Sequence, residues 1–363
     1  VWSVEGEVLA EISKRELRTG GGFGGGRGGN GGKRGLAWRA DGAGFTYIRR
    51  EPKDDDNPGK KLKDQVVLWS APFGDDNVSV VYESEDPIAS VQYAADMQTL
   101  FLTRNTNGNR IISGTTGGKE TVLSTWKSDD FYSNPGSLVS RPGKYGLGVV
   151  NVHNNEVFFS GTRYDKNPME NAPYGFVNAV SLTGGEPREV WKGSNDGVSE
   201  SVAAMPMADM SSMVIRRESP TMTPDLYMSA DNRKLTNNKD YNPEITGLKK
   251  ERFKVKRADG FEFTVTATLP DWYFEGAKLP AFFWFYPTET TDQKAWNNRS
   301  RTYNKNSFRR FGSTTKSLLC LEGYAVIDTD FPIVGAQGSQ NNNFIQDIQQ
   351  NWMAIIDACE ARG

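Results

Sequence analysis

The sequence has 363 residues, with 43 basic and 45 acidic side chains, one histidine and two cysteines. The formal net charge of −2 gives no global reason to expect nucleic acid or an anionic membrane as a partner, and no apolar run approaches the ~20 residues of a membrane-spanning helix. One histidine and two cysteines exclude a cysteine-rich zinc site and most histidine-based metal sites.

A glycine-rich segment is the first feature along the chain. Residues 19–35 read TGGGFGGGRGGNGGKRG, a composition that favours a flexible surface loop. A phosphate-binding loop would read G-x-x-x-x-G-K-[ST]. Arg27 stands where its first glycine belongs, and Arg34 where Ser or Thr belongs. The remaining alternative is weak anion binding through Arg27, Lys33 and Arg34.

Four short apolar strands then recur at nearly constant spacing. Their first residues lie about 55 to 57 positions apart, close to the ~40–50-residue period of propeller blades. A turn signal precedes each, and a further strand follows it. The pattern favours a partial β-propeller of about four blades, with an ordinary β-sandwich as the alternative. The four strands are 45–48, 100–103, 157–160 and 213–216.

The character of the chain changes after the polar stretch 235–243, which is typical of a linker. We therefore predict a propeller domain over 1–247 and an α/β domain over 248–363. Strand–helix–strand–helix order predicts a partly parallel sheet for the second domain. Its predicted elements are a hairpin of 252–256 with 261–268, a buried strand at 281–286, a helix at 314–321, a strand at 324–328 and a final helix.

The final helix is predicted from its apolar periodicity. Apolar side chains at three- and four-residue steps form one face, and Asp347 lies near the positive N-terminal end. The predicted face consists of Ile345, Ile348, Trp352, Ile355, Ile356 and Cys359. Cys320 and Cys359 both lie on largely apolar elements, so buried free thiols are favoured over a redox pair.

The segments in this second half resemble the prolyl oligopeptidase family of serine peptidases. Residues 278–287, KLPAFFWFYP, resemble the third strand of that family's α/β-hydrolase domain, and 323–328 with 331–335 resemble the fourth strand and its loop. The pairing of WFYP with PIVG is most similar to the glutamyl endopeptidase-like branch. Upstream, residues 64–73 resemble the propeller of that branch.

The resemblance implies a role for one residue. In much of the family a tyrosine at the end of this strand donates its hydroxyl to the oxyanion of the tetrahedral intermediate, and Tyr286 occupies that position. The alternative is a strand-end tyrosine with a solvated hydroxyl. No G-x-S-x-G elbow occurs in the sequence. We expect the chain to be a fragment, inactive by itself, with the Ser-Asp-His triad downstream, and we expect His153 to lie in a turn.

A basic segment follows Tyr286. A solvated loop is the favoured interpretation of this segment. The alternative hypothesis is that one or two of its arginines hold a substrate carboxylate, which would agree with cleavage after glutamate. The candidates are Arg299, Arg301, Arg309 and Arg310. Asp328 and Asp330, two apart on a strand, share a face and could form an acid–base pair, although a structural role is favoured.

The function predicted is therefore a serine-type peptidase acting on short or unfolded peptides, without metal or organic cofactor. Its partner is a peptide substrate, with no nucleic acid and no membrane span; the sequence assigns neither the oligomeric state nor the compartment, an exported location being slightly favoured. The alternative from another class is a non-catalytic propeller that binds peptides or proteins, with a degenerate hydrolase remnant. A dipeptidyl- or acylaminoacyl-peptidase is a third reading within the same fold.

Overall fold

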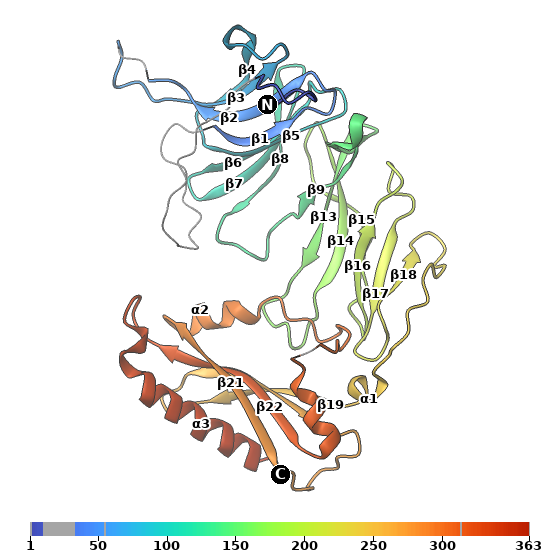
Figure 1. Cartoon of the computed structure of the whole chain (residues 1–363), viewed down its shortest axis with the longest axis vertical. Coiled ribbons are helices and arrows are strands. Elements are labelled where there is room, and N and C mark those ends of the chain that lie inside the picture. Colours follow the sequence, from blue (N-terminus) through green and yellow to red (C-terminus); the bar gives the residue numbers. More distant parts are fainter. Residues whose placement is uncertain (1, 10–32, 54–55, 313, 363) are drawn as a thin grey trace. The chain divides into compact units, whose positions relative to one another are not determined.

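The structure is a computed structural model that describes residues 2–9, 33–53, 56–312 and 314–362 (Figure 1). Most of the predicted glycine-rich loop, Arg27 included, lies outside the described residues. The chain forms two compact units by its packing. The first comprises Val1–Gly161, Phe176–Lys192 and Pro206–Ser211, and the second comprises Thr162–Gly175, Gly193–Met205 and Ser212–Gly363. The predicted division at residue 247 stays a prediction.

Small antiparallel sheets make up the first part of the chain. The first sheet has the order β1 (Arg34–Trp38), β2 (Gly44–Arg50), β3 (Asp64–Ser70), β4 (Val78–Ser84). The second has the order β5 (Ile88–Tyr93), β6 (Leu100–Thr106), β7 (Asn109–Thr116), β8 (Lys119–Lys127). The third has β12 (Val152–His153), β13 (Glu156–Arg163), β14 (Tyr174–Ser181) and β15 (Arg188–Lys192), with β9 (Ser137–Leu138) also paired to β13. The fourth has β16 (Ser199–Ala204), β17 (Val214–Glu218) and β18 (Asp225–Met228).

Shorter elements connect these sheets. They are the 3₁₀ turns η1 (Asp75–Asn77) and η2 (Lys144–Gly146), and the two-stranded ribbon of β10 (Ser140–Pro142) and β11 (Gly148–Val150).

The four predicted repeat strands are β2, β6, β13 and β17, and each is the second strand in the order given for its sheet. The turn before each one has a residue with positive φ: Gly42, Met97, Asn155 and Met210. In three of these turns an aspartate precedes that residue and accepts a hydrogen bond from the backbone N–H two positions on. Sequence periodicity thus corresponds to a repeated hairpin, while the number of blades in a closed ring stays a prediction.

Consecutive sheets within the first unit share apolar cores. Ile48 and Val66 of the first sheet pack with Leu102 of the second. Phe101 of the second sheet packs in turn with Phe159 of the third. Shared apolar cores between neighbouring small antiparallel sheets are expected of propeller blades. His153 was predicted to lie in a turn, but it is the last residue of β12, directly before the Asn154–Asn155 turn, and pairs with Glu156.

The second unit contains a four-stranded mixed sheet, β19 (Lys249–Lys256), β20 (Glu262–Leu269), β22 (Ala325–Val334) and β21 (Ala281–Thr290) in that spatial order. β19, β20 and β22 are antiparallel neighbours, whereas β21 runs parallel to β22. The partly parallel sheet was predicted. The helical elements of this unit are α1 (Pro243–Thr246), α2 (Gln293–Asn297), η3 (Asn298–Ser300), η4 (Lys316–Glu322), η5 (Gln340–Asn343) and α3 (Phe344–Glu360).

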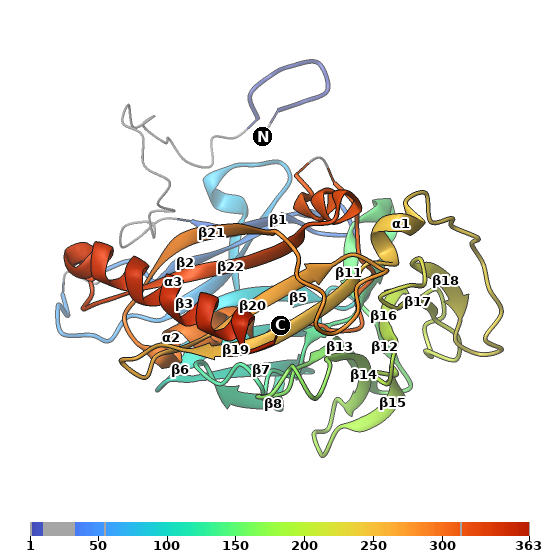
Figure 2. The same ribbon diagram turned by 90° about the horizontal axis from the view of Figure 1, so that it is seen from below.

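Helix α3 packs along one face of this sheet (Figure 2). Trp352 of α3 meets the rings of Phe283 and Phe285, each with a centroid separation of 5.1 Å, and Phe285 stacks on Phe331 at 4.2 Å. Ile355 is fully buried. Burying several large aromatic side chains makes this layer the main apolar core of the sheet.

Three predicted elements differ in detail. The parallel strands β21 and β22 are both longer than predicted and continue through Pro287 and Pro332. Neither proline interrupts the sheet, because Pro287 lies on an edge strand and Pro332 lies beyond the pairing of β22 with β20, so a neighbouring strand does not need the missing N–H. The predicted helix at 314–321 is the 3₁₀ helix η4, which ends at Gly323 with φ 86°. Ile345 and Ile356 are exposed, so the apolar face of α3 is narrower than predicted.

Within the second unit, hydrogen bonds connect the segment between α2 and η4 to the loop that precedes the fourth sheet. Asn306 is buried, and its Nδ2 donates to the carbonyls of Asn195 at 2.7 Å and Val198 at 3.0 Å. Asn304 Nδ2 reaches the Ser199 hydroxyl at 2.9 Å. These contacts hold a loop that would otherwise have unsatisfied polar groups. In the described ranges, no helix is long and apolar enough to cross a membrane.

Candidate active-site face

The two faces of the mixed sheet differ because side chains alternate along each strand. On β20, Phe263, Val265 and Ala267 are buried beneath α3. The residues between them are threonines, and these line a cavity of about 610 Å³ on the opposite face. Loop residues before β22 complete the cavity. We call the face of the sheet that bears this cavity the polar face. Its lining is Lys250, Arg252, Thr264, Thr266, Thr268, Trp296, Arg299, Ser300, Thr302, Tyr303, Thr314, Thr315, Lys316, Ser317, Val326, Asp328, Thr329 and Asp330.

Tyr286 lies on the strand at the edge of this sheet. Its neighbour Phe285 packs beneath α3, whereas the Tyr286 side chain is 69% exposed. In the parallel register Tyr286 is opposite Asp330, and Trp284 is opposite Asp328. Tyr286 therefore shares the face of the sheet that carries Asp330, just outside the lining of the cavity. Tyr286 was predicted to lie at the end of its strand, but β21 continues four residues past it to Thr290, so that part of the prediction is wrong.

Both carboxylates of the predicted pair are engaged with cations. Lys316 Nζ lies 2.8 Å from Asp328 Oδ2 and 4.8 Å from the Trp284 ring centroid. Arg299 Nη2 lies 2.8 Å from Asp330 Oδ2. Each carboxylate has its own partner, so neither is held against the other as a proton-sharing pair would require. This geometry fits the structural role favoured for the two aspartates.

Of the four candidate arginines, only Arg299 lines the polar-face cavity. Arg309 Nη1 donates to the carbonyls of Thr246 and Leu248, and its burial lowers the pKa of its guanidinium. That arginine therefore anchors the chain before β19. Arg310 is exposed and lines a separate cavity of about 260 Å³, and Arg301 also has an interaction partner.

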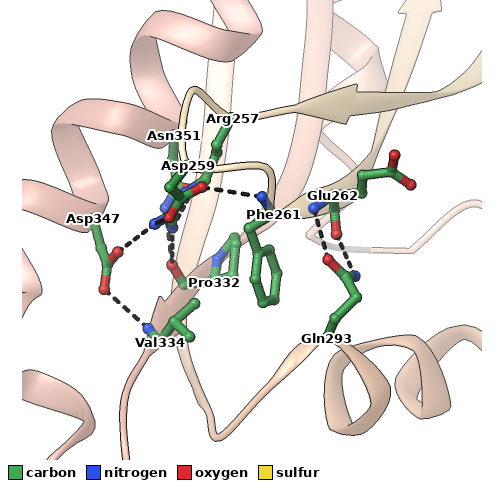
Figure 3. Close-up of polar contacts among 9 residues, drawn as sticks. All are labelled: Arg257, Asp259, Phe261, Glu262, Gln293, Pro332, Val334, Asp347 and Asn351. Carbon is green, nitrogen blue, oxygen red and sulfur yellow. Dashed lines mark hydrogen bonds and ion pairs between the residues drawn. The ribbon is translucent and has the colours of Figure 1, made fainter.

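A buried ion pair fixes the end of β22 against α3, on the other face (Figure 3). Arg257 Nη2 lies 2.6 Å from Asp347 Oδ1, and both side chains are almost inaccessible. The other oxygen, Asp347 Oδ2, accepts the backbone N–H of Val334 at 2.9 Å. The Pro332 carbonyl, which lies beyond the pairing with β20, accepts from Arg257 at 3.2 Å and from Asn351 at 3.1 Å. Side chains thus satisfy backbone groups that the sheet does not pair.

Two further contacts attach neighbouring elements to this cluster. Asp259, in the β19–β20 turn, pairs with Arg257 and accepts the Phe261 N–H at 3.0 Å. Gln293 at the start of α2 exchanges two hydrogen bonds of 2.8 Å with the backbone of Glu262 (Figure 3). The β19–β20 turn, α2 and α3 are therefore all connected at this end of the sheet.

Two groups of polar residues were not predicted from the sequence. Arg257 was given no role, although its position beside the Asp259–Gly260 turn was an available signal. Arg252 was included in a predicted strand without a role and Lys250 fell two residues before that strand, yet both line the cavity. Their spacing of two on a strand was the signal that they share a face with Thr266 and Thr268, to which they are paired.

No protein-family model matches the chain. Among curated proteins, the chain is similar to the probable glutamyl endopeptidase, chloroplastic, of Arabidopsis thaliana, with 24% identity over 361 residues. The predicted resemblance is confirmed. The match covers 92% of this chain and 37% of the relative, so the chain spans little more than a third of that protein's length.

Three solved structures are also similar, each with a TM-score of 0.42. Dipeptidyl peptidase 4 of Porphyromonas gingivalis is 13% identical, with 88% of this chain and 53% of that chain covered. A prolyl endopeptidase is 14% identical, with 92% and 52% covered, and oligopeptidase B of Leishmania major is 10% identical, with 90% and 50% covered. At these scores no conclusion about this chain rests on the superpositions.

Proposed function

We propose that this chain is part of a serine-type peptidase that hydrolyses peptide bonds in short or unfolded peptides, with cleavage after glutamate. The similarity over 92% of the chain to a protein named glutamyl endopeptidase supports the reaction class and the preference. The structural observation that supports the proposal is the 69% exposure of Tyr286 on a strand whose alternate aromatic side chains, Phe283 and Phe285, pack against the core.

In the proposed reaction a serine attacks the carbonyl carbon of the scissile peptide bond while a histidine accepts the hydroxyl proton. The carbonyl π electrons move to oxygen, and the Tyr286 hydroxyl with a backbone N–H stabilises that oxyanion. The C–N bond then breaks, and the histidine returns the proton to the leaving amine. Water hydrolyses the acyl-enzyme in the same manner. We propose that the triad lies outside these 363 residues, which contain no G-x-S-x-G motif.

The proposed role of Tyr286 has a testable magnitude. A donor that meets charge developing only in the transition state contributes about 2.7–4 kcal/mol, or 10²–10³ in kcat. In the longer protein, Tyr286→Phe should therefore lower kcat by that factor and leave KM nearly unchanged. Tyr324→Phe is the matched control, because Tyr324 is also partly exposed but lies before the other end of β22. Equal kcat values for wild type and Tyr286→Phe would overturn the assignment.

The proposal also covers the domain organisation. Residues 1–247 would contribute about four blades of a propeller that limits access to short or unfolded peptides, and residues 248–363 would contribute the first half of the hydrolase domain. The chain by itself is expected to be inactive. Steady release of a fluorophore from a glutamyl substrate by the purified 363-residue chain would contradict this part of the proposal.

A further inference from the structure

Among the described residues, two of the four cations that line the polar-face cavity form no ion pair. Lys316 and Arg299 each pair with an aspartate, as described above. Lys250 and Arg252 line the same cavity, and among the described residues neither side chain reaches a hydrogen-bond acceptor or a carboxylate. The two aspartates are already matched, so the cavity carries two positive charges in excess. Like charges placed this close repel, which favours a ligand that compensates them.

Arg252 is held in a defined orientation. Its guanidinium lies 3.8 Å from the centroid of the Tyr303 ring, the separation of a stacked pair. Stacking uses the planar face of the guanidinium and leaves its N–H edges available, and those edges match the two oxygens of a carboxylate. The Nε atom is buried and has no acceptor in the part of the chain that the structure describes.

Lys250 is two residues before Arg252 on β19, so its side chain lies on the same face of the sheet. In the sheet register Arg252 is opposite Thr266 and Lys250 is opposite Thr268, so two threonine hydroxyl groups lie beside the two cations. Desolvation, together with the charges of Arg309 and Arg252, lowers the pKa of Lys250, and the charge of Asp328 opposes this shift. A bound anion would offset the repulsion between the cations and stabilise the charged ammonium further.

We propose that Lys250 and Arg252 form a subsite for the carboxylate of an acidic residue in a bound peptide. The volume of about 610 Å³ exceeds what a single small anion fills, and the threonines offer hydroxyl groups to peptide N–H and C=O. This subsite deepens the proposed function, on which its assignment to a peptide substrate rests.

The register gives the distance from Tyr286. Arg252, Thr266, Asp328 and Trp284 form one row across the four strands. Three strand spacings of ~4.8 Å separate Arg252 from Trp284, or about 14 Å, and Tyr286 lies two residues, or about 7 Å, further along β21. The separation of Arg252 and Tyr286 is therefore about 16 Å, which an extended peptide covers in about five residues at ~3.3 Å each. The acidic residue recognised here is therefore about five positions from the scissile bond, and it is distinct from the glutamate at the cleavage site.

Binding measured by titration calorimetry with the 363-residue chain tests the subsite without requiring catalysis. The probes are a twelve-residue peptide with a glutamate at the fifth position on each side of a central Glu–Ala bond, and the same peptide with glutamine at those two positions. The test variant is Lys250→Met/Arg252→Met. The matched control is Lys254→Met/Lys256→Met, which removes two charges from the same strand and face outside the cavity. Thermal melting verifies that both variants fold.

We expect the glutamate peptide to bind at least tenfold more tightly than the glutamine peptide to wild type and to the control. The test variant should lose that difference. Equal loss in the control variant, or equal affinity for the two peptides in wild type, would overturn the subsite. Inorganic phosphate and glutarate serve as free-anion probes, and tighter binding of either one than of the glutamate peptide would overturn the peptide assignment. If the longer protein lacked peptidase activity, the proposed function would fail while these binding results stood.

Discussion

Arg257 and Asp347 are 90 residues apart in sequence, yet their side chains form a buried ion pair at 2.6 Å. The pair connects the β19–β20 turn to the first turn of α3, and both partners also bind backbone groups at the end of β22. One pair of charges thus connects the β19–β20 turn, the end of β22 and helix α3.

Breaking this pair should be costly. Asp347→Ala leaves the Val334 N–H without its acceptor and leaves the buried Arg257 charge with the partly exposed Asp259 as its remaining ion-pair partner among the described residues. Removing one partner of a buried pair costs about 3–5 kcal/mol, and because Asp259 still compensates part of the charge we expect a loss of about 3 kcal/mol. Urea unfolding followed by far-ultraviolet circular dichroism measures the loss. Asp357→Ala, at an exposed position of the same helix, is the control and should change the free energy of unfolding by less than about 0.5 kcal/mol. A loss of similar size in both variants would show that the pair has no special role.

Arg299 should contribute to the choice of substrate. Its pair with Asp330 is solvent-exposed and worth little, about 0–1 kcal/mol, so the guanidinium can turn to a substrate carboxylate near Tyr286. In the longer protein, Arg299→Met should lower kcat/KM for a glutamyl substrate about tenfold relative to a glutaminyl one. Arg310→Met should leave the ratio unchanged, since Arg310 lines a different cavity. An unaltered ratio in both variants would remove Arg299 from the specificity site.

The aspartate in the hairpin turn before β6 should make the stability of the fold depend on pH. Burial raises the pKa of Asp96, but hydrogen bonds from Thr99 and Gln98 outweigh it and hold that pKa below its ordinary value. A carboxyl with a lowered folded-state pKa stabilises the fold above its unfolded pKa of about 3.9, and that contribution is lost as the pH falls further. Asp96→Asn should therefore lower Tm at pH 7, and the difference from wild type should shrink between pH 5 and pH 2. A difference that is constant over this range would contradict the assignment.

The two cysteines should react slowly. Cys320 is completely buried and donates to the Thr268 carbonyl, Cys359 is partly buried, and burial raises the pKa of both thiols. Because the thiolate is the reactive form, labelling by a disulfide reagent at pH 8 should be slower than for a free cysteine and should accelerate as the pH rises. Cys320 should react only after unfolding. Rapid labelling of both in the native protein would indicate that this part of the sheet opens readily.

The sequence predicted most of the strands but fewer of the side-chain partners. Periodicity located β2, β6, β13 and β17, because a half-buried strand must alternate or concentrate its apolar residues. It could not show that Arg299 meets Asp330 whereas Arg309 binds two backbone carbonyls, since those contacts depend on how the loop after α2 folds back. The exposure of Ile345 and Ile356 was missed for a related reason: helical spacing gives the direction of a side chain, but not the width of the surface that covers it.

The sheet order also determines where β21 can accept a new neighbour. Among the described strands β21 pairs only with β22, so one line of its backbone donors and acceptors is available to an incoming segment. A strand added there would gain main-chain hydrogen bonds whatever its side chains. Trp284 and Tyr286 would then lie on a central strand instead of an edge strand, and the phenol would have a neighbouring strand on each side. Enclosure of this kind would exclude water from the hydroxyl and so strengthen any hydrogen bond that it donates.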